Sequence, residues 1–451
     1  MASSLTFRQF ISLAFFLFSM FLGAGNIIFA PPLGQAAGTN LWVAMGGFLI
    51  TGVGLVLLAI IALSIAGGSI ESLAGRVSPS FAKIFSILLF LTLGPIYVVP
   101  RTSAVVYEVS ALPFISQEAS SGSFLILLAF SLCFMGLTIY LSLEPKKLVA
   151  RMGDVLTPIF LVLLAVIVAK SLMTPIGPWA APSGAYIDNA FGKGFTIGYY
   201  TMDVLAAFVF GKIFLDAARN AGVHPSQMAK LFVRAGAFAV LSLAAVQLSL
   251  ASMGASSVSV LGVSTNGGEA LPKMVHLLLG NAGVGMLACV VLLTGLTTAI
   301  ACLAAVSEYF SRIYPQLSYK AWVWAFGALS LLIANFGLTT ILKFASPVLL
   351  FLYPIAISLI ALVFLNDRFG GRRAVYVGTV IGAGIMGVVD GLKDIAMLPA
   401  GIDSSLAAYV PLYGAGVGWI VFAVVGGVAG WIVCMLAGNT NRAVFKNSPV
   451  A

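Results

Sequence analysis

Charged residues are scarce in this chain of 451 residues, where Asp, Glu, Lys and Arg together make up only 8%. Soluble domains carry about 25% charged residues. Hydrophobic residues make up 61% of the chain, which is more apolar surface than a soluble core can bury. The long apolar runs lack the alternation of barrel strands and favour helices. We therefore expect an all-α integral membrane protein.

Catalytic and nucleotide-binding motifs are missing as well. The sequence contains no metal-ligand spacing, no phosphate-binding Gly-Lys-Ser or Gly-Lys-Thr loop and no nucleophile elbow, and its two histidines, His224 and His276, lie far apart near loops. These absences argue against an enzyme and against ATP hydrolysis by the chain itself. We expect no cofactor, and uphill transport would have to use an ion gradient.

Paired cysteines and a signal-peptide cleavage pattern are also missing. The four cysteines lie within apolar runs and are most simply small core residues. The first apolar run is long enough to span a bilayer, so we expect it to stay in the mature protein. The net charge of +9 predicts loop charges that set membrane orientation rather than a nucleic-acid partner.

Apolar runs of about 20 residues predict about twelve transmembrane helices. They cover residues 9–30, 41–66, 82–100, 124–143, 153–173, 194–214, 231–254, 277–309, 321–337, 341–365, 374–396 and 411–436. One side of the membrane would hold only six of the 23 basic residues, namely Arg101, Lys170, Lys193, Lys273, Lys343 and Lys393. The positive-inside rule then puts both termini in the cytoplasm.

Two of these segments have polar interruptions, five helices apart. The first segment breaks at Gly23 to Asn26, and the sixth breaks at Gly198 to Asp203. Interrupted segments at matching places in two halves point to the binding site of a secondary transporter. Because five helices per half is an odd number, the second half would be inverted. We predict repeats at 1–175 and 185–366, with residues 370–440 as an appendix of two helices.

The break in the first segment has two ends that suit opposite charges. Its second half would begin with unpaired N–H groups, which suit a carboxylate, and its first half would end with bare carbonyls, which suit a cation. The side chain of Asn26 adds an oxygen for a hard cation. The alternative is that Gly23 and Gly25 only allow close helix packing.

The sixth and eighth segments supply further polar residues. Asp203 follows Tyr199, Tyr200, Thr201 and Met202, and a carboxylate inside a membrane is a candidate functional residue. It could meet a substrate ammonium, a sodium ion or a proton, or form a structural pair. In the eighth segment the hydroxyls of Thr297 and Thr298 could flank an ion, with the carbonyl of Thr294 one turn earlier. Alternatively, they bond back to the preceding turn.

The third segment carries Tyr97, whose hydroxyl could reach a carboxylate. Arg101 and Glu108 follow it and mark either a gate or the helix end. Lys343 of the tenth segment would pair with Asp203 or Glu108, or extend to the interface.

Five stretches together resemble the branched-chain amino acid:cation symporter family, within the amino acid–polyamine–cation superfamily. They are Phe21 to Pro32, Gly94 to Arg101, Gly198 to Asp203, Leu296 to Ala304 and Ser346 to Pro354. The resemblance implies the LeuT-like fold of five plus five inverted helices, with helices 1 and 6 broken. It also implies import of leucine, isoleucine and valine into bacteria with sodium, or with protons in some members.

The resemblance also implies roles for particular residues. N–H groups of Gly23, Ala24 and Gly25 would hold the substrate carboxylate. Carbonyls of Ser19 and Leu22, with Thr297 and Thr298, would hold one sodium ion, and Asn26 with Thr201 would lie at a second. Asp203 replaces a small neutral residue of the relatives, which leaves the number of sodium ions open.

The side chain of the substrate would need an apolar pocket. We predict that Tyr97, Tyr199, Tyr200, Met202, Val204 and Leu205 shape it. Such a pocket separates substrates by only about 1–3 kcal/mol per methylene, so leucine, isoleucine and valine would share it.

The sequence thus predicts a sodium-coupled symporter of branched-chain amino acids in the bacterial cytoplasmic membrane, surrounded by lipid. The alternatives are a proton-coupled amino acid carrier, with Asp203 as the titrating group, and an uncoupled channel or membrane module.

Overall fold

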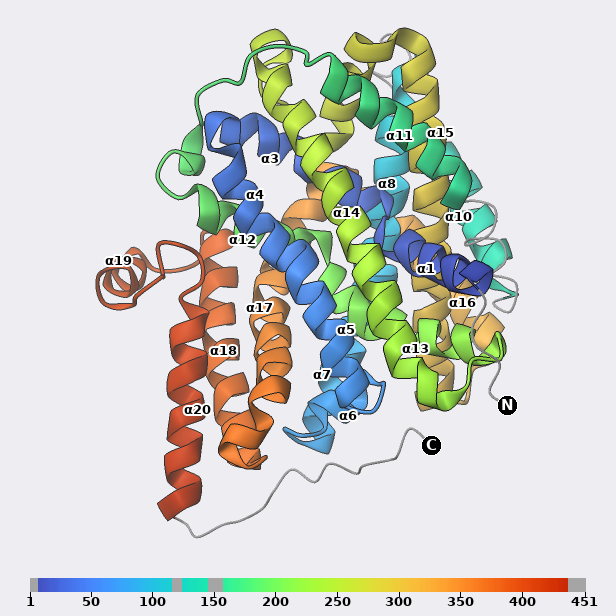
Figure 1. Cartoon of the computed structure of the whole chain (residues 1–451). Coiled ribbons are helices and arrows are strands. Elements are labelled where there is room, and N and C mark those ends of the chain that lie inside the picture. The colour runs from blue at the N-terminus through green and yellow to red at the C-terminus, as the bar shows by residue number, and fades with distance from the viewer. Residues whose placement is uncertain (1–6, 116–123, 145–156, 437–451) are drawn as a thin grey trace. The chain divides into compact units, whose positions relative to one another are not determined.

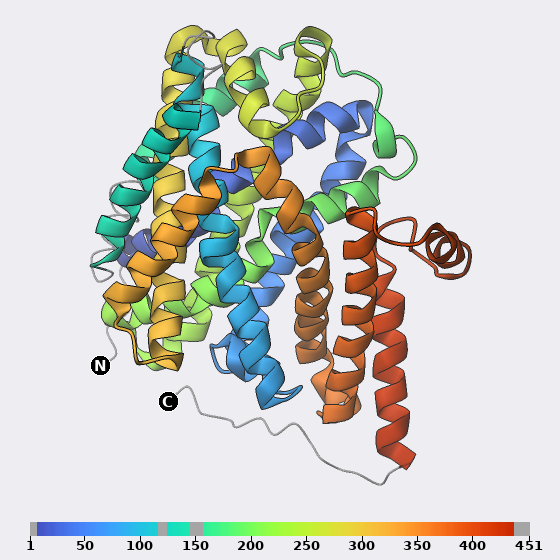
Figure 2. The same cartoon turned by 180° about the vertical axis from the view of Figure 1, so that it is seen from behind.

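A computed structural model describes residues 7–115, 124–144 and 157–436 of the chain. The first four residues of the predicted segment 153–173 lie outside these ranges, as do the basic residues between 145 and 156 and those beyond 436. The described residues form helices joined by turns and loops, including a long loop over residues 174–189 (Figures 1 and 2).

The α-helices before residue 175 are α1 (Phe7–Phe21), α2 (Ala24–Ile27), α3 (Ala30–Ala37), α4 (Leu41–Leu49), α5 (Leu55–Ile65), α6 (Ile70–Ala74), α7 (Pro79–Leu91), α8 (Val98–Ser110), α10 (Phe124–Ser142) and α11 (Thr157–Met173). Those that follow are α12 (Ala190–Thr201), α13 (Asp203–Asn220), α14 (Pro225–Leu261), α15 (Gly267–Ile313), α16 (Tyr319–Ala334), α17 (Leu338–Leu365), α18 (Arg373–Asp394), α19 (Ala400–Tyr409) and α20 (Trp419–Leu436).

The twelve predicted segments coincide with these helices, singly or as consecutive runs. The second segment is α4 and α5 joined by a π-helical turn at Ile50–Gly54, and the third is α7 and α8 joined by another at Thr92–Ile96. By length and apolarity, eight helical stretches of the described residues can cross a membrane, and α1, α11 and α16 are shorter apolar helices. The expectation of an all-α, multi-pass membrane protein is confirmed.

Several predicted ends were wrong. The third segment continues through α8 to Ser110 instead of ending at residue 100, because the residues after Pro100 are regular helix and mostly buried. The eighth begins at Gly267 and bends at Gly280, whose φ of 62° is left-handed. The twelfth begins at Trp419, because the chain turns repeatedly between 410 and 418, and α19 was not predicted.

One compact unit comprises residues 1–46, 90–190 and 234–343. Within it α15 packs along α8, α11 and α16 (Figure 2). Phe90 stacks on Tyr309 with ring centroids 4.0 Å apart, and a Cβ added to Gly295 would lie against Val106 of α8. This dense packing makes α15 the central helix of the unit, and α15 carries the predicted threonines.

The other compact unit comprises residues 47–89, 191–233 and 344–451. Its helices α18 and α20 pack through a Gly-x-x-x-Gly pair on each, Gly378 with Gly382 and Gly426 with Gly430. A Cβ added to any of these four glycines would run into the backbone of the facing helix. Small residues allow helices to approach closely in membranes. Helix α17 runs alongside α18 in this unit (Figures 1 and 2).

Candidate functional site

The first helix break follows Phe21, where α1 ends, and Gly23 is extended with φ −87° and ψ 165°. In an unbroken helix the N–H of Gly23 would donate to the Ser19 carbonyl, but it donates to the Phe21 carbonyl at 2.8 Å. Likewise the N–H of Asn26 donates to the Gly23 carbonyl at 3.0 Å rather than to Leu22. The carbonyls of Ser19 and Leu22, which are predicted to bind a cation, therefore lose the N–H groups that would donate to them in an unbroken helix.

The side chain of Asn26 closes the end of α1. Its Nδ2 atom donates to the Phe21 carbonyl, and the residue is only 2% exposed. The last carbonyls of a helix lack intrahelical donors, so this amide satisfies one of them.

The three threonines of α15 differ in their hydrogen bonds. The Oγ1 of Thr294 donates to the Val290 carbonyl at 2.9 Å, and that of Thr297 donates to the Thr294 carbonyl at 2.8 Å. The Oγ1 of Thr298 is buried and has no hydrogen-bond partner among the described residues. Leaving a buried hydroxyl unpaired costs about 1–3 kcal/mol. Of the three threonines, Thr298 is therefore the one whose hydroxyl is available to coordinate an ion.

Thr298 lies directly against the break. A Cβ added to Gly23 would lie 2.6 Å from the Thr298 Oγ1, so glycine is what lets the hydroxyl reach the backbone there. One turn earlier on α15, a Cβ added to Gly295 would lie 3.4 Å from the Cβ of Ala24. The unsatisfied hydroxyl therefore lies beside the interrupted backbone of α1. In transporters, backbone carbonyls at broken helices coordinate sodium.

A buried cation also lies beside this break. Arg101 of α8 is 3% exposed, and a Cβ added to Gly25 would overlap its guanidinium. Its Nη1 donates to the Tyr97 hydroxyl at 3.1 Å. The guanidinium lies 4.7 Å from the ring centroid of Tyr97 and 5.6 Å from that of Phe29. These contacts hold the positive charge of Arg101 next to α2, where the sequence predicts that the carboxylate of the substrate binds.

The second helix break lies in the other unit and separates α12 from α13. Met202 is left-handed there, with φ 67° and ψ 12°, a conformation uncommon for residues other than glycine. Asp203 follows as the first residue of α13 and is 3% exposed. The positive end of the helix dipole favours a carboxylate at that position. Thr201 donates its hydroxyl to the Gly198 carbonyl at 2.8 Å.

The two tyrosines of α12 make contacts inside the same unit. The Tyr199 hydroxyl accepts a hydrogen bond from Trp419 Nε1 at 3.1 Å, and its ring stacks on Tyr353 with centroids 4.5 Å apart. The hydroxyls of Tyr200 and Ser346 are 2.7 Å apart. These contacts anchor both tyrosines, and their role toward a substrate stays a prediction.

The structure therefore groups the predicted site residues by unit. The first unit holds Ser19, Leu22, Gly23, Ala24, Gly25, Asn26, Tyr97, Thr294, Thr297 and Thr298, and the second holds Tyr199, Tyr200, Thr201, Met202 and Asp203. Arg101 also lies in the first unit. The sequence alone did not decide whether Arg101 forms a gate or marks the helix end. The signal was its position four residues after Tyr97, which puts both side chains on one helical face.

The remaining charged candidates behave differently. Glu108 lies in the last turn of α8, which ends at Ser110, and a Cβ added to Gly268 would meet its carboxylate. Lys343 is exposed and forms no ion pair with any residue that the structure describes. Extension of its side chain to the membrane interface stays a prediction.

The solved structures that the chain resembles have the LeuT-like fold. MhsT in complex with L-phenylalanine has a TM-score of 0.55 at 18% identity, over 94% of this chain and 98% of MhsT. The inward-facing conformation of Mhp1 has a TM-score of 0.56 at 14% identity, over 95% of this chain and 91% of Mhp1. At such identities the likeness shows the fold alone.

The chain belongs to the branched-chain amino acid transport protein family, whose model matches residues 6–437. It is 41% identical over 443 residues to the branched-chain amino acid permease BraB of Bacillus subtilis (strain 168), covering 98% of this chain and 99% of BraB. It is 34% identical over 426 residues to the permease BrnQ of Escherichia coli (strain K12), covering 94% and 95%. The chain is thus a multi-pass bacterial membrane transporter and not an enzyme, and the family resemblance is confirmed.

Proposed function

We propose that this transporter imports leucine, isoleucine or valine together with sodium across the cytoplasmic membrane, by alternating access and with both termini in the cytoplasm. The relatives BraB and BrnQ are named as permeases of branched-chain amino acids, which supports the substrate class. The excess of basic residues on one side supports the orientation.

The unsatisfied hydroxyl of Thr298 at the break after Phe21 carries the proposal of sodium coupling. A sodium ion bound there would be coordinated by the Thr298 Oγ1 and by the carbonyl oxygens of Ser19 and Leu22. The N–H groups that would donate to these carbonyls in an unbroken helix donate elsewhere. The C-terminal end of α1 adds its partial negative charge. The hydroxyl of Thr297 donates to its own helix but keeps lone pairs for a cation. All these ligands are neutral, so an empty site leaves no buried charge unpaired.

The carboxylate of the substrate would bind on the α2 side of the same break. The N–H groups that open α2 offer hydrogen bonds, and the guanidinium of Arg101 beside Gly25 offers a positive charge. An arginine can hold a carboxylate through two parallel hydrogen bonds. The ion and the carboxylate would then bind to opposite ends of one break, so that each favours binding of the other.

Proton coupling through Asp203 is the second candidate, because this carboxyl group is buried at the other helix break. At this place Asp203 could take up a proton, or it could meet a substrate amine or a sodium ion.

Equilibrium binding tests the proposal without transport. Radiolabelled leucine binding to the purified protein in detergent is measured while sodium replaces choline at constant ionic strength. We expect leucine affinity to rise with sodium, and sodium affinity to rise with leucine by the same factor, as linkage requires. A leucine affinity that does not change with sodium but changes with pH would support the proton-coupled carrier instead.

A further inference from the structure

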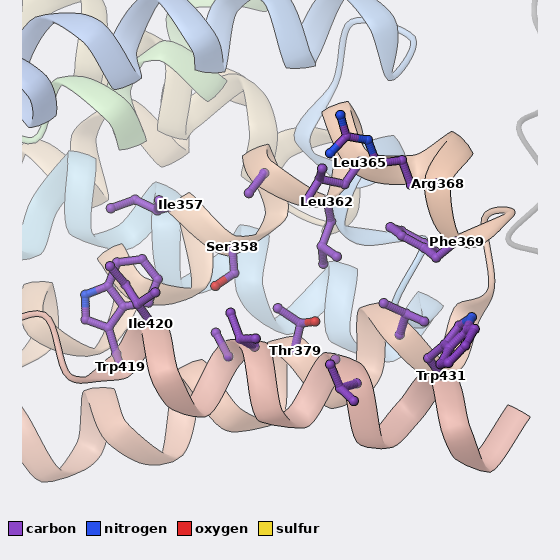
Figure 3. Close-up of a pocket in the computed structure, with 16 residues that line it drawn as sticks. Ile357, Ser358, Leu362, Leu365, Arg368, Phe369, Thr379, Trp419, Ile420 and Trp431 are labelled. Atoms are coloured by element: carbon purple, nitrogen blue, oxygen red, sulfur yellow. The ribbon is translucent and has the colours of Figure 1, made fainter. Parts of the chain in front are cut away.

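A groove of about 500 Å³ lies in the second unit between α17, α18 and α20 (Figure 3). Its walls are almost wholly apolar and include Leu362, Leu365, Val375, Ala423, Val428 and Trp431. Side chains on its wall are open to the outside, since Val424 is 59% exposed, Val428 50% and Trp431 42%. For a helix in a membrane, this outside is the hydrocarbon of the bilayer.

The groove has the length of one lipid chain. Trp419 and Trp431 mark its two ends in Figure 3. They are twelve residues apart on α20, which is about 18 Å along a helix. One leaflet of a bilayer contributes about 15 Å of hydrocarbon, half of the 30 Å core. An acyl chain entering from one membrane surface would therefore run the length of the groove.

Arginines lie at one end of this groove only. Arg368 belongs to the turn Asn366–Phe369 and lines the groove near Phe369, at the same end as Trp431 (Figure 3). Two further arginines open α18, where Arg373 donates to the Val77 carbonyl at 2.7 Å. Arg372 has a buried Nη1 without a hydrogen-bond partner among the described residues. The orientation proposed above puts this end at the cytoplasmic surface.

We propose that this groove binds one anionic phospholipid, with an acyl chain along α20 and the headgroup phosphate against Arg368. Basic pockets between transmembrane helices on the cytoplasmic side bind anionic headgroups. Tryptophan at the level of the headgroups is typical of membrane proteins. The apolar wall and the one-sided positive charge match the two parts of such a lipid, whereas the ammonium group of a zwitterionic headgroup would be repelled by the arginines and offset the attraction of its phosphate.

Native mass spectrometry of the purified protein tests this site. The protein is titrated with dioleoyl phosphatidylglycerol, and dioleoyl phosphatidylcholine is the neutral comparison. One variant, Arg368→Gln, removes the headgroup contact, and another, Ala361→Trp, fills the groove while leaving the arginines in place. Lys320→Gln is the matched control, because Lys320 is exposed and does not line the groove.

We expect one tightly bound phosphatidylglycerol in the parent protein. An arginine near the membrane surface contributes about 1 kcal/mol to anionic lipid binding, so Arg368→Gln should weaken it about fivefold. Ala361→Trp should abolish the bound lipid, and Lys320→Gln should leave it unchanged. Equal binding by all variants, or equal affinity for phosphatidylcholine, would overturn the proposal. The proposal would also be overturned if the parent protein were a dimer and Ala361→Trp made it a monomer without changing the bound lipid. The occupant of the groove would then be a second copy of the chain.

Discussion

Replacing Thr298 with valine separates ion binding from folding. Valine keeps the shape of threonine and removes the hydroxyl, which has no partner among the described residues. A hydrogen-bonding group that interacts with a charge contributes about 1.5–3 kcal/mol. We therefore expect the sodium concentration for half-maximal leucine uptake to rise about ten- to a hundredfold, while maximal uptake at saturating sodium changes little.

Thermal unfolding in detergent gives an independent measure of the same change. Sodium at 100 times its dissociation constant would stabilise the parent protein by about 2.7 kcal/mol, and a ten- to hundredfold weaker site lowers this to about 0.4–1.4 kcal/mol. Without sodium, Thr298→Val should be as stable as the parent or more stable, because it removes an unsatisfied buried hydroxyl. Thr298→Ser should behave like the parent.

Thr294→Val is the matched control, because the Thr294 hydroxyl donates to the Val290 carbonyl at 2.9 Å. It should lose about 1 kcal/mol of stability with or without sodium and keep the parent's sodium dependence. If Thr294→Val and Thr298→Val weakened sodium activation equally, or if Thr298→Val destabilised the sodium-free protein, the assignment of the ion to Thr298 would be refuted.

Three further changes probe the substrate side and the second break. Gly25→Ala should impair leucine uptake because its Cβ overlaps the guanidinium of Arg101, whereas Gly46→Ala, with open space at its Cβ, should not; uptake by the two variants is compared directly. Arg101→Lys keeps the charge but loses the two-pronged contact, so the KM for leucine should rise about tenfold or more while inhibition by leucinol, which has no carboxylate, stays constant; a parallel loss of both would make Arg101 structural. Asp203→Asn should abolish uptake or change the ratio of sodium to leucine measured by dual-label uptake, and normal sodium-driven uptake would reduce Asp203 to a structural role.

The sequence predicted the helical segments and both breaks because their signals are local. Apolar runs of membrane length define helices, and Gly23 to Asn26 interrupts such a run visibly. Helix ends were less predictable. Ser110 lies beyond a proline that usually ends a helix, and the turns before Trp419 are themselves apolar enough to extend a predicted segment.

Which hydroxyl lacks a partner could not be predicted, because that depends on packing between distant helices. Thr294 and Thr298 are the same residue type and lie one turn apart, yet Thr298 is the one whose hydroxyl lies against Gly23. Arg101 is a similar case. Its burial beside Gly25 depends on how α8 and α2 pack, whereas its sequence neighbours suggested only a helix end or a gate.

The most direct test of sodium symport is leucine uptake into proteoliposomes with the sodium and proton gradients varied independently. An inward sodium gradient at equal pH on both sides should concentrate leucine above its external level, and an inward proton gradient without sodium should not. Sodium symport would be contradicted if the proton gradient alone concentrated leucine, or if leucine merely equilibrated under both gradients.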